Sequence, residues 1–199
     1  MRKTVLTLIC LLHVSWASSA TVCGIHCPPR LEKSLKTIEQ LTEAREFINE
    51  IKKQGPIKFS ADAEGPAREF GACWDCDRRI IFVNPDFHES TGAMIGSILF
   101  ELQNAYVSAK YDHLDHLAAT GQINRSNYVR EAERVEYHNS INAAAMAQKG
   151  IDCGLFPKDA RLPTYPNFEK HFQMQQWAGH SEQVARNYDL ARRLAHYRS

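Results

Sequence analysis

The apolar residues of this chain recur at helical spacing over four long segments. Leucine and isoleucine follow one another every three or four positions in residues 28–53, with charged side chains between them. Comparable patterns cover residues 90–117, 126–149 and 167–197. A period near 3.6 residues predicts amphipathic helices. Within the last segment, Gly179 is expected to bend the helix or split it in two.

Two short segments between the first two predicted helices are typical of strands. Residues 57–60 follow a Gly-Pro turn signal, and residues 79–83 are rich in β-branched side chains and end at an Asn-Pro pair. The helix over 90–117 carries apolar or small residues on two faces, so we expect it to be covered on both sides. This order predicts an α+β fold that is predominantly helical, with a small two-to-three-stranded sheet packed on the central helix.

The N-terminus has the pattern of a cleavable signal peptide. A basic start is followed by a mostly apolar run over residues 5–16, and Ala20 ends a small-residue site for a signal peptidase. A run this short is typical of a signal peptide and not of a membrane span. We therefore expect a signal peptide at residues 1–20, a single globular domain at 21–199 and no stable membrane span after cleavage. The predicted location is the periplasm or the outside of the cell.

The charge balance of the chain does not indicate binding to nucleic acid. The chain contains 24 Lys and Arg against 23 Asp and Glu, a formal net charge of +1. Proteins that bind nucleic acid or anionic membranes carry a clustered positive excess, so we expect neither partner. Aromatic residues of the last segment, among them Trp177 and Tyr188, either anchor a protein partner or belong to the core. The oligomeric state stays open.

Export makes the cysteines candidates for disulfide bonds, because exported proteins meet an oxidising environment. Close spacing favours two local disulfide loops, the first between Cys23 and Cys27 and the second between Cys73 and Cys76. Pairing between these two sets is equally allowed. An odd number leaves at least one thiol unmatched. A redox or zinc site is less favoured, because a strand-like segment follows the second pair and no further ligand pair has clear spacing. The five cysteines beyond the signal peptide are Cys23, Cys27, Cys73, Cys76 and Cys153.

The central predicted helix carries the sequence FELQN at residues 100–104. This segment resembles the H-E-x-x-H motif of the zincin metallopeptidases, in which two histidines bind zinc and the glutamate activates water. Phe100 and Asn104 stand at the two ligand positions, and Glu101 stands at the position of the general base. Phenylalanine has no ligand atom and asparagine is a poor zinc ligand, so we expect no zinc cofactor.

The resemblance extends over residues 57–150. A strand, residues 79–83, precedes the helix as the edge strand does in small zincins, and a later helix carries acidic residues where such peptidases place a third ligand: Glu131, Glu133 and Glu136. With both histidines replaced, the resemblance implies a relative that has lost its metal chemistry. Our first hypothesis is an exported, non-catalytic binding or interaction protein of pseudo-metallopeptidase type.

The alternative hypothesis is a carboxylate-based or metal-dependent hydrolase acting outside the cytoplasm. Glu101 with Glu133 or Glu136 would form a paired-carboxylate site if their carboxyl groups lay about 5–10 Å apart in an open cleft. The competing interpretation is that the latter two are surface residues paired with Arg130 and Arg134. Convergence in one pocket would favour the hydrolase. Three aromatic residues are expected to line such a groove: Trp74, Tyr106 and Tyr137.

A second cluster of possible metal ligands lies near the end of the central predicted helix. Asp112 and His116 are one turn apart, and His113 is close to both, a spacing that allows a transition metal to bind. The favoured interpretation is a solvated helix end, where the helix dipole stabilises cationic histidine. Other histidines are scattered along the chain and are expected to be structural or exposed and not catalytic: His138, His171, His180 and His196.

Overall fold

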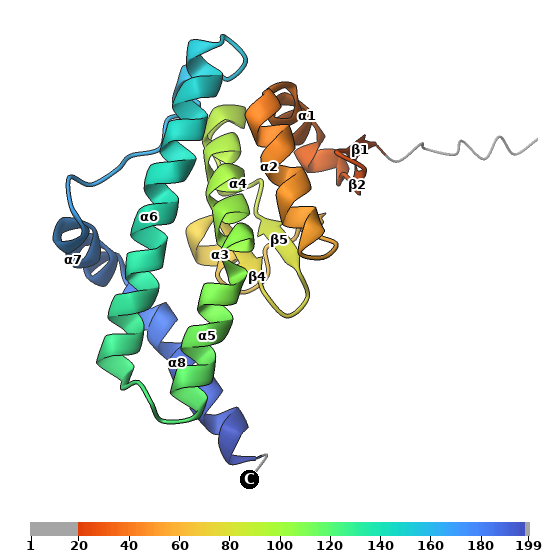
Figure 1. The fold of residues 1–199 in the computed structure, drawn as a ribbon. Helices are drawn as coiled ribbons and strands as arrows, with labels where there is room; N and C mark the ends of the chain where they lie inside the picture. Colours follow the sequence, from red (N-terminus) through yellow and green to blue (C-terminus); the bar gives the residue numbers. More distant parts are fainter. Residues whose placement is uncertain (1–19, 198–199) are drawn as a thin grey trace, which may run out of the picture.

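The computed structural model describes residues 20–197 and forms a predominantly helical α+β fold, as the sequence predicts (Figure 1). Apart from Ala20, the predicted signal peptide lies outside the described residues. The first elements are β1 (Thr21–Val22), β2 (Ile25–His26), η1 (Pro29–Leu31), α1 (Glu32–Gln40), α2 (Thr42–Lys53), β3 (Lys58–Ser60), α3 (Ala67–Phe70), β4 (Ala72–Asp75) and β5 (Ile80–Val83). The remaining elements are α4 (Thr91–Tyr106), α5 (Ser108–Ala119), α6 (Arg125–Asp152), η2 (Lys158–Ala160), α7 (Phe168–Ala178) and α8 (His180–His196).

The helix predicted over residues 28–53 is divided at Leu41. This residue has an extended backbone with ψ of 117°, so α1 ends before it and α2 begins after it. Its side chain is buried, and the break lets both helices turn their leucine and isoleucine faces toward the same apolar cluster. The pattern of apolar residues is continuous across the break, which is why it predicts one helix.

The principal sheet has three strands in the order β3-β5-β4. The central strand β5 pairs in parallel with β3 and antiparallel with β4. The strand over 79–83 was expected at the edge, as in small zincins, and this expectation is wrong because β4 covers its free side. The sequence does not reveal β4, since its Ala-Cys-Trp-Asp segment lacks a β-branched pattern.

Helix α4 is the central helix of the fold (Figure 1). It packs against the sheet, α1, α2 and α6, and buried residues occur all around it. Near its start, a Cβ atom added at Gly96 would lie 3.0 Å from a methyl group of Leu162, so Leu162 packs closely against the helix at this glycine. The helix predicted over 90–117 is interrupted at Val107, which separates α4 from α5.

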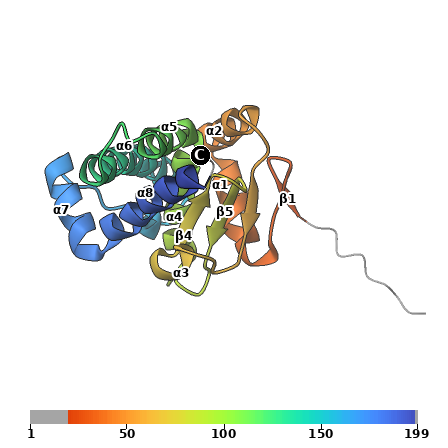
Figure 2. The ribbon, with the colours of Figure 1, turned by 90° about the horizontal axis from the view of Figure 1, so that it is seen from below.

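The C-terminal helices form a second layer (Figure 2). Asn124 caps the 28-residue helix α6 by accepting a hydrogen bond from the Asn127 amide. The last predicted helix splits at Gly179, as expected, because this glycine has a left-handed backbone with φ of 82°. Helix α8 then packs on α5 and α6 around a separate apolar cluster. No helix among residues 20–197 is long and apolar enough to cross a bilayer.

The helix predicted over residues 126–149 ends before Gly150, but α6 continues through this glycine to Asp152. The glycine instead makes room for Phe156, since an added Cβ atom would lie 2.2 Å from the ring. We predict that Gly150→Ala lowers the free energy of unfolding by about 1–2 kcal/mol, because overpacking at ~1–3 kcal/mol outweighs the helix propensity gain of alanine. Urea unfolding measures the effect. The control is Asn142→Ala at an exposed site of the same helix, and equal stability of both variants would contradict the packing argument.

Candidate functional site

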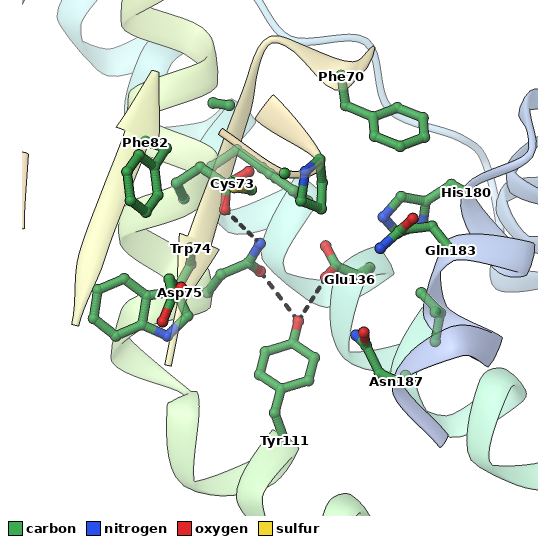
Figure 3. Close-up of a pocket in the computed structure, with 18 of the residues that line it drawn as sticks. Phe70, Cys73, Trp74, Asp75, Phe82, Tyr111, Glu136, His180, Gln183 and Asn187 are labelled. Atoms are coloured by element: carbon green, nitrogen blue, oxygen red, sulfur yellow. Dashed lines mark hydrogen bonds between the residues drawn. The ribbon is translucent and has the colours of Figure 1, made fainter. Parts of the chain in front are cut away.

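A pocket of about 520 Å³ opens between β4, α4, α6 and α8 (Figure 3). It lies between the two apolar clusters, so the packed cores on either side hold its walls in place. Aromatic, carboxyl, amide and imidazole groups all face it. The lining residues that matter for its chemistry are Phe70, Cys73, Trp74, Phe100, Glu101, Asn104, Tyr111, Glu136, His180, Gln183 and Asn187.

A network of polar contacts joins two buried carboxyl groups across this pocket. The Asn104 amide donates to Glu101 Oε2 at 3.0 Å, and Asn139 donates to the Asn104 oxygen at 2.8 Å. The Tyr111 hydroxyl lies 3.1 Å from that same oxygen and donates to Glu136 Oε1 at 2.8 Å (Figure 3). Glu101 and Glu136 therefore belong to one polar network.

The network follows from a short pattern on two facing helices. Glu101 and Asn104 lie three residues apart on α4, and Glu136 and Asn139 have the same spacing on α6. Residues three apart share a helix face, so each helix presents one carboxyl and one amide to the other. Helices α4 and α6 make the most extensive contact in the fold, and the two pairs meet where they cross.

Burial makes Glu101 a weak acid. Loss of solvent raises the pKa of the Glu101 carboxyl to about 8, and the nearby charge of Glu136 adds to the effect, while hydrogen bonds from Asn104 and the Trp74 backbone oppose it. Burial also raises the pKa of Glu136, against the charge of His180 and the hydrogen bond from Tyr111. At neutral pH, Glu101 therefore holds a proton, and burial makes both carboxyl groups harder to ionise than in water.

The second oxygen of Glu136 has no hydrogen-bond partner in the structure. Oε1 is bound by Tyr111, whereas Oε2 is buried from solvent and unpaired. Buried carboxylate oxygens are normally satisfied, because an unpaired one costs about 1–3 kcal/mol or more. Glu136 is one of the residues that line the pocket, so this unpaired oxygen lies in the wall of the site.

Glu133 lies outside the pocket, although it is only three residues from Glu136. It is fully buried, accepts from the Ser181 hydroxyl at 2.7 Å and lies 3.1 Å from His180 Nδ1. The Nε2 atom of His171 lies 3.5 Å from its other oxygen, without a well-formed hydrogen bond between them. Of the three predicted carboxyl groups, the pocket thus brings together Glu101 and Glu136 only.

Glu133 and His180 stabilise each other's charges. Burial alone would raise the pKa of Glu133, but contacts with His171, His180 and Ser181 outweigh it and lower the pKa to about 2. Burial likewise opposes the charge of His180, yet Glu133 and Glu136 raise the pKa of its imidazole to about 9. Glu133 is therefore anionic and His180 cationic at neutral pH.

The arginines of α6 do not pair with the glutamates of the site. Arg130 binds a glutamate of α7, and Arg134 lies 3.5 Å from Glu131. The expectation that they hold Glu133 and Glu136 at the surface is wrong, because both glutamates face inward between helices.

Only one of the three predicted aromatic lining residues reaches the pocket. Trp74 lines it. Tyr106 is 43 % exposed and packs against Phe47, and Tyr137 packs against Phe168. Neither lines the pocket that holds the carboxyl pair, so their expected place in a groove with it is wrong.

The predicted ligands Asp112, His113 and His116 are exposed on α5. Within residues 20–197, no group of three or more His, Cys, Asp or Glu side chains has a metal-binding arrangement. The zincin-like positions do not fit zinc either: Phe100 offers no ligand atom, and the Asn104 oxygen already accepts from Asn139.

All five cysteines of the described part carry free thiols in the structure. Cys73 lines the pocket, and burial raises the pKa of its thiol to about 12, so it is a poor nucleophile at neutral pH. Disulfide pairing stays a prediction.

Comparison of the chain with protein-family models, curated proteins and solved structures finds no match. The site is therefore interpreted from its own geometry. Sequence patterns did not point to Tyr111, Asn139 or His180. The repeated Glu-x-x-Asn spacing was a usable signal for Asn139, whereas His180 reaches the pocket only through the packing of α8 on α6.

Proposed function

We propose that this protein is a carboxylate-based hydrolase with Glu101 as general acid and Glu136 as general base. The observation that carries the proposal is the pair of buried carboxyl groups in one pocket, joined through Asn104 and Tyr111. Carboxyl groups whose environments separate their ionisation are suited to acid and base roles in one reaction. Burial keeps the pKa of Glu101 near 8, which leaves its proton available at neutral pH.

In this reaction, the protonated Glu101 donates its proton to the leaving group as the scissile bond breaks. Water adds to the substrate and gives a proton to the carboxylate of Glu136, whose Oε1 is held by Tyr111. One water is consumed and two product groups are released. Proton exchange with solvent then returns Glu101 to the acid and Glu136 to the carboxylate.

The zincin-like resemblance supports a second candidate, a non-catalytic binding protein. Phe100, Glu101 and Asn104 all line the pocket, so the altered motif faces a cavity. Asn104 is held by internal hydrogen bonds, as expected where a former ligand position has become part of a wall. On this proposal the pocket retains a ligand without cleaving it. In both cases the predicted signal peptide supports a periplasmic or secreted location, where disulfide bonds between the cysteines are also proposed.

The purified protein tested on panels of peptides and glycans separates the two candidates. We expect hydrolysis of one substrate class, and a fall in kcat/KM of about 10²–10⁴-fold in Glu101→Gln, as is typical for loss of a general acid. The wild-type pH profile should lose activity above pH 8, where Glu101 gives up its proton.

Glu89→Gln provides the matched control, because it makes the same chemical change at an exposed position just before α4. Full activity in Glu101→Gln would refute the acid–base assignment. Binding of a panel member without turnover would favour the binding protein. Stoichiometric zinc in elemental analysis would overturn both assignments.

A further inference from the structure

His180 enters the pocket from the first turn of α8, and its orientation is set by a buried anion behind it. The Nδ1 atom lies 3.1 Å from Glu133 Oε1 and must donate there, because a carboxylate only accepts. The two ring nitrogens lie on opposite sides of an imidazole, so Nε2 is directed away from Glu133. Phe70 packs edge-on against the ring with centroids 5.4 Å apart, which further restricts its rotation (Figure 3).

Glu133 is connected to both helices that follow it. It holds Ser181 and His180 at the start of α8 and approaches His171 of α7 at 3.5 Å. The left-handed Gly179 between these helices allows the chain to turn at this point. A fully buried carboxylate that accepts from two residues at the start of α8 fixes this end of the α7–α8 hairpin on α6.

We propose that Glu133 is a positioning residue that clamps the α7–α8 hairpin and aims His180 Nε2 into the pocket, where it donates a hydrogen bond to a substrate oxygen. The donor role rests on the proposed hydrolase, whereas the clamp is independent of it. The titratable groups around His180 are Glu133 and Glu136 on α6 and Glu101 on α4, with His171 on α7 near the carboxylate of Glu133.

The charges favour a neutral substrate with an acceptor oxygen. Glu133 already neutralises His180, so the charge of the imidazole is balanced and does not favour an anionic group. A carbonyl or ether oxygen accepts from His180 without carrying a negative charge. The amide side chains of Gln183 and Asn187 lie on the same face of α8 as His180 and line the same pocket, so they suit a neutral polar group.

Histidine NMR titration tests the clamp without requiring activity. In the wild-type protein we expect His180 to titrate with a pKa of about 9. In Glu133→Gln we expect this pKa to fall by about two pH units or more, because the compensating anion is lost. Glu131→Gln is the control, since Glu131 is exposed on the same helix and contacts Arg134.

The outcomes are distinct. A wild-type His180 with an ordinary histidine pKa, or an unchanged pKa in folded Glu133→Gln, overturns the clamp. If Glu133→Gln does not fold, Ser181→Ala serves instead: an altered titration or chemical shift of His180 supports the clamp, and an unchanged one overturns it.

If substrate is hydrolysed, His180→Gln and Glu133→Gln should lose similar factors in kcat, and full kcat in His180→Gln overturns the donor role. If nothing is hydrolysed, the hydrolase fails while the titration still decides the clamp.

Discussion

Glu101→Gln is expected to be more stable than the wild-type protein at pH 8 and above. Burial raises the pKa of Glu101 from 4.5 in the unfolded chain to about 8 in the folded protein. The stability gained from burying the neutral acid is complete below pH 4.5 and is lost as the pH rises toward 8 and beyond. Linkage over this window costs the wild-type protein on the order of 4 kcal/mol by pH 8, and glutamine, which does not ionise, avoids that cost.

Urea unfolding of both proteins at pH 5 and at pH 8 measures this effect. His180 also contributes less stability in the alkaline range, because its pKa is raised from 6.5 to about 9 in the folded protein. Its contribution is complete below pH 6.5 and is lost as the pH rises through 9. That contribution is common to both proteins and largely cancels in their difference. Glu89→Gln should follow the wild-type curve. Parallel curves for wild type and Glu101→Gln would show that Glu101 ionises normally in the fold.

The opposite effects expected for one substitution have a common cause. A carboxyl group that is kept protonated at neutral pH is useful as a proton donor and costly once it ionises in a buried site. Replacing it should therefore remove activity and add alkaline stability together. A carboxyl retained only for packing would give the second effect without the first, so the two measurements on Glu101→Gln are informative as a pair.

Helix positions could be predicted from the sequence because they depend on local periodicity. The breaks at Leu41 and Val107 could not, since the apolar pattern continues through both and tertiary packing decides where each helix turns. Gly179 was predictable because glycine favours a left-handed backbone. Strand β4 forms through pairing with β5, and the local sequence of β4 does not predict this contact.

The site was predictable in part. Glu101 stood out as a lone acid in an apolar helix, and Glu136 as an acid on a helix expected to face it. Assigning Glu133 to the same group failed because residues three apart on α6 can meet different neighbours: Glu136 faces α4, whereas Glu133 faces α7 and α8. The place of His180 depends on how α8 folds back, which only the tertiary structure shows.

Glu133→Ala is expected to lower the free energy of unfolding by about 3–5 kcal/mol, the range found when one partner of a buried ion pair is removed. The variant leaves His180 and Ser181 without their acceptor. Because the folded pKa of Glu133 is about 2 against 4.5 unfolded, its stabilisation is present above pH 4.5 and is lost as the pH falls through 2.

The difference between wild type and Glu133→Ala should therefore be largest near neutral pH and shrink in acid, which urea unfolding at pH 7 and pH 3 measures. Glu131→Ala is the control: its carboxyl is 48 % exposed and contacts Arg134 at 3.5 Å, a surface pair worth about 0–1 kcal/mol. If both variants lost equally little, Glu133 would not anchor the α7–α8 hairpin. A large loss of stability in Glu133→Ala alone would instead show that this one buried carboxylate holds α8, which lines one side of the pocket, against α6.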